Sequence, residues 1–149
     1  MSKRRKNIYF TSDTHFGHHN VIKFDNRPFQ GVYQMDKGII KRWNSVVREQ
    51  DIVYHLGDVG FYKGDTAVDK MHDIVSQLNG TKIVLRGNHD KGYQTLLQYG
   101  FDSAMHNFTM EIANEMVTVS HYPLIGVWRE DVTGMNNAVE GDNWHGETK

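Results

Sequence analysis

Histidine is the residue type in this chain with the greatest capacity for chemistry. The sequence contains nine histidines and no cysteine. The absence of cysteine excludes disulfides, thiolate nucleophiles and cysteine-based zinc or iron–sulfur sites. Histidine is the most common metal ligand and a frequent general acid or base near neutral pH. We therefore expect any chemistry to rest on imidazole groups and on oxygen ligands.

Four short motifs place aspartate, asparagine or histidine directly after a run of β-favouring residues. They are Asp13-Thr14-His15, Gly57-Asp58, Gly87-Asn88-His89-Asp90 and Ser120-His121. Oxygen and imidazole donors without sulfur suit manganese, iron or zinc. Asp13 and His15 are two residues apart in an extended segment, so their side chains point to the same side and could share one ion. One such motif alone is more often a turn or a structural histidine, but four in order indicate a single site.

The elements that would position these motifs alternate between strands and helices. Short apolar, β-favouring runs predict strands over residues 8–12, 51–56 and 81–86. Apolar residues at helical spacing predict helices over residues 35–47, 67–78 and 93–99. This order is typical of an α/β chain with a parallel sheet and right-handed crossovers.

Such a sheet would bring the four motifs together, because ligands of parallel sheets bind outside the carboxyl ends of the strands. Gly57 and Gly87 each precede a donor residue. Glycine there permits a sharp turn and a close approach of the backbone to a bound group. Further strands over residues 103–112 and 115–120 are predicted to form a hairpin, and the chain after Pro123 is predicted to be loop.

The composition is that of one domain without a membrane segment. The chain has 149 residues and a formal net charge of −1, from 17 Lys and Arg against 18 Asp and Glu. A chain of this length can fold as one domain, which we expect to span residues 1–149. No apolar run approaches a membrane span, and the basic N-terminus lacks the apolar core of a signal peptide, so we expect a cytoplasmic protein without a membrane partner. The net charge argues against nucleic acid as a partner without excluding it, and the oligomeric state stays open.

The motifs Asp13-x-His15, Gly57-Asp58, Gly87-Asn88-His89-Asp90 and His121, taken together, resemble those of the calcineurin-like metallophosphoesterases. The flanking sequences of residues 10–18, 26–29 and 53–58 are similar to a small bacterial and phage subgroup, and the resemblance covers roughly residues 7–125. It implies an αββα four-layer sandwich of two mixed β-sheets flanked by helices. The implied activity is hydrolysis of a phosphoester, with a phosphodiester favoured over a monoester. The substrate would be a small molecule or a nucleotide, and the nucleophile a hydroxide that bridges two divalent metal ions, manganese, iron or zinc.

The resemblance also implies a role for each residue of the motifs. Asp13 and His15 would bind the first metal ion, and Asp58 would bridge both ions. Asn88 and His121 would bind the second ion. A bridging carboxylate offers one oxygen to each ion, and two ions can clamp an in-line displacement at phosphorus.

Other residues are expected to act around the metal ions. His89 would be the general acid or would stabilise the transition state, with Asp90 orienting its ring. His18 and Arg27 are candidate substrate-binding residues, although Arg27 could equally form a structural salt bridge. His55 is expected in the core or behind the ligands. The remaining histidines of this region are read as surface or packing residues: His19, His72 and His106.

The C-terminal motif departs from the family pattern. The family ends its motif set with Gly-His-x-His, but here Gly146 is followed by Glu147 and Lys149. Each metal ion thus loses one expected imidazole, and Glu147 or His145 could act as a substitute ligand. The alternative function is therefore a weakened or inactive metal- or phosphate-binding member of the family. Family members continue into further strands at this point, which leaves open whether the second sheet is complete.

Overall fold

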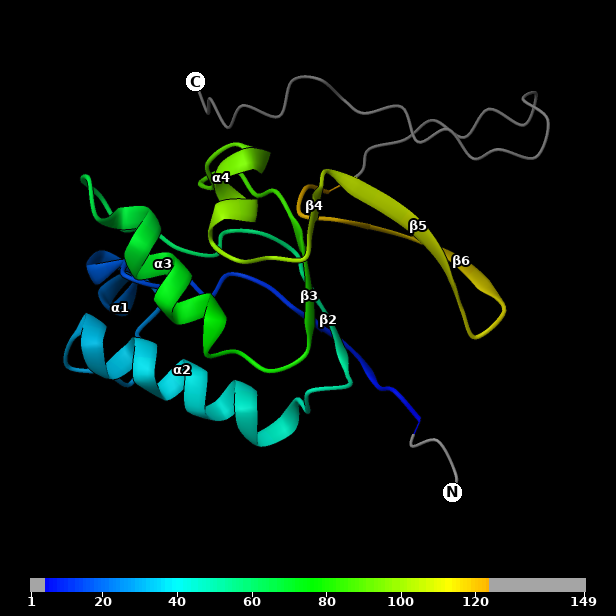
Figure 1. Ribbon diagram of the computed structural model, residues 1–149, viewed down its shortest axis with the longest axis horizontal. Coiled ribbons are helices and arrows are strands. Elements are labelled where there is room, and N and C mark those ends of the chain that lie inside the picture. The colour runs from blue at the N-terminus through cyan, green and yellow to red at the C-terminus, as the bar shows by residue number, and fades with distance from the viewer. Residues whose placement is uncertain (1–4, 124–149) are drawn as a thin grey trace.

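The computed structural model of the protein describes residues 5–123 (Figure 1). Strands and helices alternate along the first part of the chain, and three strands follow in succession. The strands are β1 (Ile8–Thr11), β2 (Ile52–His55), β3 (Thr81–Leu85), β4 (Ser103–Met105), β5 (Asn107–Ile112) and β6 (Glu115–Ser120). The helices are α1 (His19–Phe24), α2 (Val32–Val46), α3 (Ala67–Ser76) and α4 (Tyr93–Gln98).

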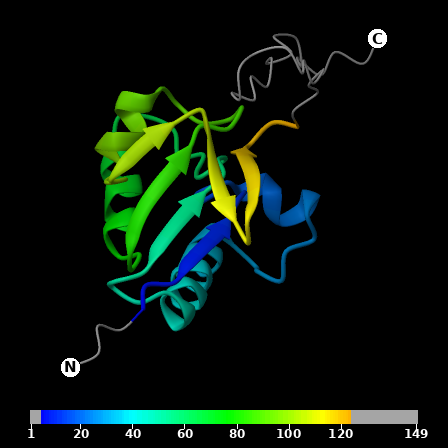
Figure 2. The same cartoon turned by 90° about the vertical axis from the view of Figure 1, so that its right-hand side faces the viewer.

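Strands β1 to β4 form one parallel sheet in the order β1-β2-β3-β4. Helices α2, α3 and α4 lie on one face of this sheet, and the β5–β6 hairpin lies on the other (Figures 1 and 2). Residues on the helical face alternate with residues on the hairpin face, as the pleat of a strand requires. Val53 and His55 of β2 are accordingly buried, whereas the residues between and before them are only partly buried. The carboxyl ends of β1, β2 and β3 therefore meet at one edge of the sheet.

The core fills the space between the parallel sheet and its helices. Met71, Ile74 and Val75 of α3 contribute the apolar stripe that the sequence predicts for that helix. Trp43 of α2 is 8% exposed and belongs to the same cluster, as expected from its position in the predicted stripe. At about 25 cal/mol per Å² of apolar surface, this burial is the main force that holds the helices against the sheet.

The β5–β6 hairpin is confirmed, including its turn at Ala113 and Asn114. Both turn residues have positive φ, 51° and 65°, the values that a two-residue type I′ turn needs. The hairpin contacts the parallel sheet through aromatic rings, since the centroid of Phe108 lies 4.7 Å from that of Tyr54. Tyr54 in turn stacks on Phe10 of β1 at 5.4 Å. These contacts make the hairpin a second layer of β-structure.

Two elements differ from the sequence prediction. The single strand expected over residues 103–112 is divided at His106 into β4, which joins the parallel sheet, and β5, which joins the hairpin. Helix α1 was not predicted, because its six residues bury only Val21 and so carry no apolar stripe. The expected α/β class and its layered arrangement of two sheets with helices are confirmed. Within residues 5–123 the first sheet is wholly parallel and the second wholly antiparallel.

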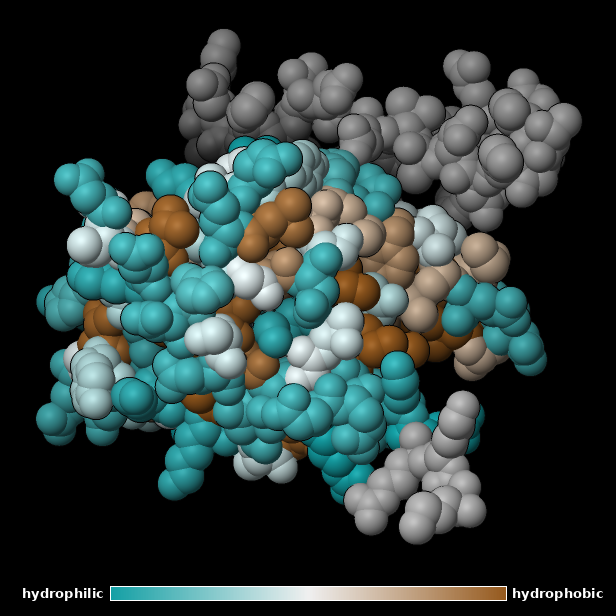
Figure 3. All heavy atoms as spheres, in the orientation of Figure 1, coloured by the Kyte–Doolittle hydropathy of each residue, from teal (hydrophilic) through white to brown (hydrophobic). Residues whose placement is uncertain are grey.

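The surface of the described residues is mainly hydrophilic on the face shown in Figure 3, with apolar patches, one of them beside the hairpin. Among these residues, no helix combines the length and the apolar character that a membrane span requires.

Candidate functional site

Four segments bring the predicted donor residues to one edge of the parallel sheet. Asp13 and His15 follow β1, Asp58 follows β2, and Asn88 follows β3. His121 comes directly after β6 of the hairpin. The expectation that the motifs meet at strand ends is therefore confirmed.

The first donor group consists of Asp13, His15 and Asp58, one ligand atom of each lying within 4.8 Å of the others. His15 Nε2 lies 3.6 Å from Asp13 Oδ1 and 3.9 Å from Asp58 Oδ2. These separations are too long for hydrogen bonds. They fit two ligands of one ion, because ligand bonds of about 2.1 Å allow a separation of up to roughly 4.2 Å. This group could hold a metal ion.

The second donor group consists of Asp58, Asn88 and His121. His121 Nδ1 donates to the carbonyl oxygen of Leu56 at 2.7 Å, which leaves the lone pair of Nε2 available. Asn88 Oδ1 lies 2.8 Å from this Nε2, and Asp58 Oδ1 lies 3.8 Å from it. A neutral imidazole nitrogen, an amide oxygen and a carboxylate oxygen are all acceptors. Three acceptors that converge in this way suit a cation between them.

The carboxylate of Asp58 is shared between the two donor groups. Its Oδ2 faces His15 and its Oδ1 faces His121. The side chain is only 5% exposed, and the backbone N–H of His89 donates to Oδ1 at 3.0 Å. A buried carboxylate that directs one oxygen to each group has the geometry of a bridging ligand.

The backbone of the ligand loops is strained at the candidate ligands themselves. Asp13, His15 and Asp58 have φ values of 55°, 51° and 54°, in the left-handed region that favours glycine. Such residues cost about 1–3 kcal/mol each and persist where the surrounding structure fixes them. Here the two loops pair, because Asp13 N–H donates to Gly57 O at 3.0 Å and His15 N–H donates to Asp58 O at 3.1 Å. The strained residues are thus the candidate ligands, and the hydrogen bonds between the two loops hold them in this conformation.

Gly57 and Gly87 are required by the close packing of the two loops against each other, whereas the sequence analysis expected glycine there to let the backbone approach a bound group. A Cβ atom on Gly57, whose φ is 103°, would lie 2.6 Å from the backbone nitrogen of Gly87. A Cβ atom on Gly87 would collide with Asp58 Oδ1. The two loops can approach each other only because both positions lack a side chain.

Asp90 has a different role from the one expected, which was to orient the His89 ring. Its buried carboxylate accepts hydrogen bonds from the backbone N–H groups of Asp58, Val59 and Gly87, at 2.7, 2.9 and 2.8 Å. These bonds hold the loops after β2 and β3 together. The expectation failed because all three partners of Asp90 are backbone groups and two of them belong to another loop, which a sequence motif does not reveal.

Arg27 anchors the loop after β1, so the salt-bridge alternative fits better than the phosphate contact. Its guanidinium donates to the carbonyl oxygens of Thr14 and Asp13, at 2.8 and 2.9 Å. It also donates to the Asp25 carboxylate at 3.1 Å. With these donors occupied, Arg27 supports the candidate ligand loop rather than facing a substrate.

His18 and His89 lie beside the first donor group. The ring of His15 has its centroid 5.4 Å from that of His18 and 6.2 Å from that of His89. Phe61 contacts both of these outer rings, at 4.6 Å from His18 and 6.1 Å from His89. Burial, followed by the nearby charges of His15 and His89, lowers the pKa of His18. Its Nδ1 is buried without a hydrogen-bond partner in the described part of the chain.

The remaining histidines have the positions expected of them. His55 is 1% exposed and lies in the core behind the ligands. His19 and His72 are exposed, and His106 stacks on Tyr122 at 5.8 Å. The proposed substitute ligands, His145 and Glu147, lie outside the described residues.

Sequence reasoning missed Asp36 and Tyr62, which support the loop after β1. Asp36 of α2 is buried, and its carboxylate accepts from Gly17 N–H at 3.1 Å and from the Tyr62 hydroxyl at 2.6 Å. Burial raises the pKa of Asp36, and the two hydrogen bonds oppose that shift. The available signal was an acidic residue beside Met35, within the apolar stripe of a predicted helix.

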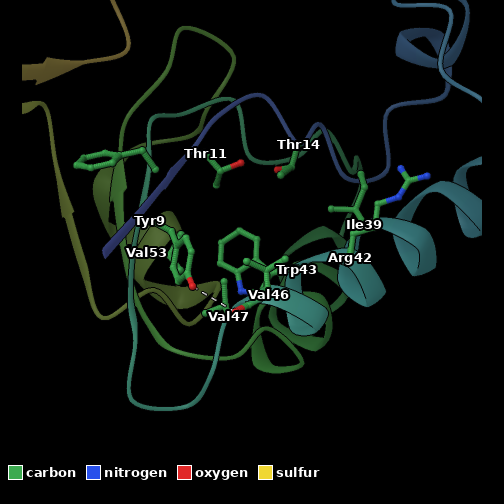
Figure 4. Close-up of a pocket in the computed structure, with 10 residues that line it drawn as sticks. Tyr9, Thr11, Thr14, Ile39, Arg42, Trp43, Val46, Val47 and Val53 are labelled. Atoms are coloured by element: carbon green, nitrogen blue, oxygen red, sulfur yellow. Dashed lines mark hydrogen bonds between the residues drawn. The ribbon is translucent and has the colours of Figure 1, made fainter. Parts of the chain in front are cut away.

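A cavity of about 300 Å³ lies behind the loop after β1, between that strand and α2 (Figure 4). Tyr9 and Thr11 of β1 line it from the sheet, and Ile39 and Trp43 line it from the helix. Thr14 also contributes to the wall, so the cavity adjoins the ligand loop from its apolar side. None of the candidate ligands lines it, and the candidate chemistry therefore lies elsewhere.

Known proteins are similar to this one over most of the chain. The sequence profile of the calcineurin-like phosphoesterase family matches residues 6–147. An uncharacterized protein of Methanocaldococcus jannaschii is 40% identical, over 97% of this chain and 86% of that protein. A protein of unknown function from Aquifex aeolicus, known from a crystal structure, has a TM-score of 0.67 and 32% identity, over 86% of this chain and 67% of that one.

Phage proteins are also similar. The gene 66 protein of Mycobacterium phage L5 is 36% identical over 56% of this chain and 40% of that protein. The gene 66 protein of phage D29 is 26% identical over 80% of this chain and 65% of that protein. The chain thus spans less than two thirds of either phage protein. The presence of phage relatives fits the small bacterial and phage subgroup that the flanking sequences resemble. Together with the loops that gather aspartate, asparagine and histidine at one sheet edge, the profile match shows that this chain belongs to the calcineurin-like phosphoesterase family, whose members are metal-dependent phosphoester hydrolases.

Proposed function

We propose that this protein hydrolyses a phosphoester with two divalent metal ions. The first ion would be held by Asp13 and His15, the second by Asn88 and His121, and Asp58 would serve both. The observation that carries the proposal is the buried Asp58 carboxylate, with one oxygen toward each donor group. The donors are oxygen and imidazole, which favours manganese, iron or zinc.

Two bound ions would supply an activated water and a clamp for in-line displacement at phosphorus. The residues of the chain would do the remaining work. Asp58 and Asp13 place negative charge where two cations have to be held. His121 donates from Nδ1 to the carbonyl oxygen of Leu56, so its Nε2 lone pair would face the second ion together with Asn88 Oδ1. Outer partners of this kind set the tautomer and orientation of a ligating histidine.

His89 is proposed as the general acid or the stabiliser of the transition state. Its ring is exposed, and its backbone N–H is fixed on Asp58 Oδ1 at 3.0 Å. The backbone of His89 is thereby tied to the carboxylate at the centre of the site. An imidazole held there can donate a proton to a leaving oxygen or stabilise its developing charge.

His18 is proposed as a substrate contact. Among the described residues its Nδ1 is buried without a partner, and its ring lies between Phe61 and His15. The ring lies beside that of the candidate ligand His15, where an imidazole N–H could donate to a phosphoryl oxygen. We favour a phosphodiester as the substrate, of a small molecule or a nucleotide.

The test compares the wild-type chain with Asp58→Asn and His89→Ala. Each protein is incubated with Mn²⁺ and with bis-p-nitrophenyl phosphate or p-nitrophenyl phosphate, and its metal content is measured. We expect Asp58→Asn to lose metal and activity. His89→Ala should keep its metal and lose about 10²- to 10⁴-fold in rate, the usual contribution of general acid catalysis. His72→Ala, on the exposed side of α3, is the control. Equal rates in all four proteins would overturn the proposal.

The alternative is a metal- or phosphate-binding protein without turnover. The sequence observation that favours it is Glu147 and Lys149 at the places where the family has histidine. A lysine cannot ligate a metal ion while it is protonated. This alternative predicts fewer than two equivalents of bound metal and no metal-dependent hydrolysis.

A further inference from the structure

The side chain of His55 lies behind the candidate site rather than in it. It is the last residue of β2, and its ring is held between two aromatic side chains of the core. Trp43 stacks on it with centroids 6.5 Å apart, and Phe101 meets it edge-on at 6.2 Å. These contacts confine the plane of the ring, and the hydrogen bonds of its two nitrogens decide which way round it sits.

The hydrogen bonds of the ring determine its tautomer. Gly57 N–H donates to Nδ1 at 3.1 Å, so Nδ1 is the unprotonated nitrogen. Nε2 carries the proton and donates to Thr14 Oγ1, 2.9 Å away. Thr14 Oγ1 donates to the carbonyl oxygen of Val59 at 2.8 Å. The bonds therefore run in one direction, from Gly57 through His55 and Thr14 to Val59.

Only a neutral imidazole can make this chain of bonds, because a protonated ring has no acceptor. Burial lowers the pKa of His55 to about 3, and the charge of Asp13 opposes that shift. The imidazoles of His121 and His15 lower the pKa further. The ring is therefore neutral near neutral pH.

Apart from His55, each residue in this series of hydrogen bonds is next in sequence to a candidate ligand. Thr14 separates the two ligands of the loop after β1, and Gly57 and Val59 flank the ligand of the loop after β2. Val59 O also accepts from Phe16 N–H at 2.8 Å, which joins the same two loops a second time. The bonds of His55 thus connect the loops without using an atom of any candidate ligand.

We propose that His55 is a positioning residue of the metal centre, which through Thr14 sets the distance between the ligand loops that follow β1 and β2. This inference rests on the proposed function, because it assigns His55 to the support of the same metal site. Without the bond between His55 and Thr14, the left-handed backbone of Asp13 and His15 loses one of the contacts that fix it. The distances from Asp13 and His15 to Asp58 then vary, and the first ion is held less tightly.

The experiment changes Thr14, because substitution of His55 alters the core as well. Thr14→Val removes the hydroxyl and keeps the shape of the side chain, whereas Thr14→Ser keeps the hydroxyl. Mn²⁺ affinity of the full chain is measured by isothermal titration calorimetry. We expect Thr14→Val to bind about 10-fold more weakly than wild type, the lower end of the loss seen when a direct hydrogen-bond partner of a ligand is removed, because Thr14 acts on the loops and not on a ligand atom. Thr14→Ser should bind like wild type.

Val75→Ala is the matched control, because Val75 is fully buried in α3 and lies outside both loops. It should lower the melting temperature and leave Mn²⁺ affinity unchanged. A second readout uses the metal-free protein, in which the ¹⁵N chemical shifts of His55 should show a proton on Nε2 and none on Nδ1.

Two results would overturn the role of His55: a folded Thr14→Val protein that binds Mn²⁺ as tightly as wild type, or a proton on His55 Nδ1. If wild type itself binds none of Mn²⁺, Zn²⁺ and Fe²⁺, the proposed function fails, and the positioning role fails with it. The first pair of outcomes leaves the proposed function intact, so the two failures are distinguishable.

Discussion

At the scale of single residues, the Asp58 carboxylate is the group on which both donor groups depend. A buried charge is costly unless it is paired, and histidine nitrogens face this one at 3.8 and 3.9 Å. The sequence located Asp58 and its neighbours through residue type and position after a strand. It did not reveal that Asp90 and Arg27 act on backbone groups, because those partners come from loops distant along the chain.

The close approach at Gly87 gives a prediction for a single methyl group. In Gly87→Ala the new Cβ meets the Asp58 carboxylate and also lies 2.6 Å from the Asp58 backbone nitrogen, so Asp58 has to move. We expect a loss of about 1–3 kcal/mol in the free energy of unfolding, as for other overpacked sites. Metal binding should fall as well, because both donor groups use Asp58. Denaturant titration and metal analysis measure the two effects.

Gly92→Ala is the control in the same loop, since no atom lies within 4 Å of a Cβ built on Gly92 and its φ is −61°. A compatible change from glycine to alanine stabilises a protein by about 0.4–1 kcal/mol. If Gly87→Ala matched Gly92→Ala in both stability and metal content, the proposed packing around Asp58 would be wrong.

At the scale of elements, periodicity was a reliable guide where an element is long or deeply buried. The apolar stripes of α2 and α3 and the runs of β2 and β3 were all predicted near their observed bounds. Helix α1 was missed because six residues with one buried side chain show no period. The break between β4 and β5 was missed because both halves favour β-structure, and only the tertiary pairing separates them.

Arg27 gives the prediction at this scale, because it connects the segment between α1 and α2 to the loop after β1. Arg27→Lys has one ammonium in place of a guanidinium fork, so it cannot reach both carbonyl oxygens and Asp25 together. We expect weaker Mn²⁺ binding and a lower kcat, with KM for a phosphodiester unchanged. Calorimetry and steady-state kinetics measure these quantities.

The opposite pattern would show that Arg27 contacts substrate: a raised KM with Mn²⁺ affinity unchanged. Arg48→Lys is the control, since Arg48 is exposed and lies before β2, away from the ligand loops. Arg48→Lys should leave Mn²⁺ affinity, kcat and KM as they are in wild type.

At the scale of the whole molecule, the site is supported by buried polar side chains. Asp36, His55 and Asp90 each bond to a loop that carries or adjoins candidate ligands. Unfolding releases all of these groups to water at once. Because folding raises the pKa of Asp36 and lowers the pKa of His55, the stability of the whole domain should depend on pH.

The sign of this dependence differs between the groups. Burial raises the pKa of Asp36 from 3.8, so its contribution is greatest at low pH and is lost as pH rises through the raised value. Burial lowers the pKa of His55 from 6.5 to about 3. Its contribution is present above pH 6.5 and is lost as pH falls toward 3, because the unfolded chain then binds a proton that the folded chain excludes.

The last prediction isolates His55 by comparing pH slopes rather than absolute stabilities. Below pH 6.5, His55 should lower the free energy of unfolding by about 1.4 kcal/mol per pH unit. His55→Gln keeps a donor for Thr14 but cannot titrate, so its stability should fall less steeply between pH 6.5 and 5 in urea titrations with chelator present. Asp36 contributes equally to both proteins and cancels in the difference. His72→Gln, on an exposed position, should retain the wild-type slope. Equal slopes for wild type and His55→Gln would mean that His55 takes up a proton in the folded protein between pH 6.5 and 5. The hydrogen bond from Gly57 N–H to His55 Nδ1 would then be lost in that pH range.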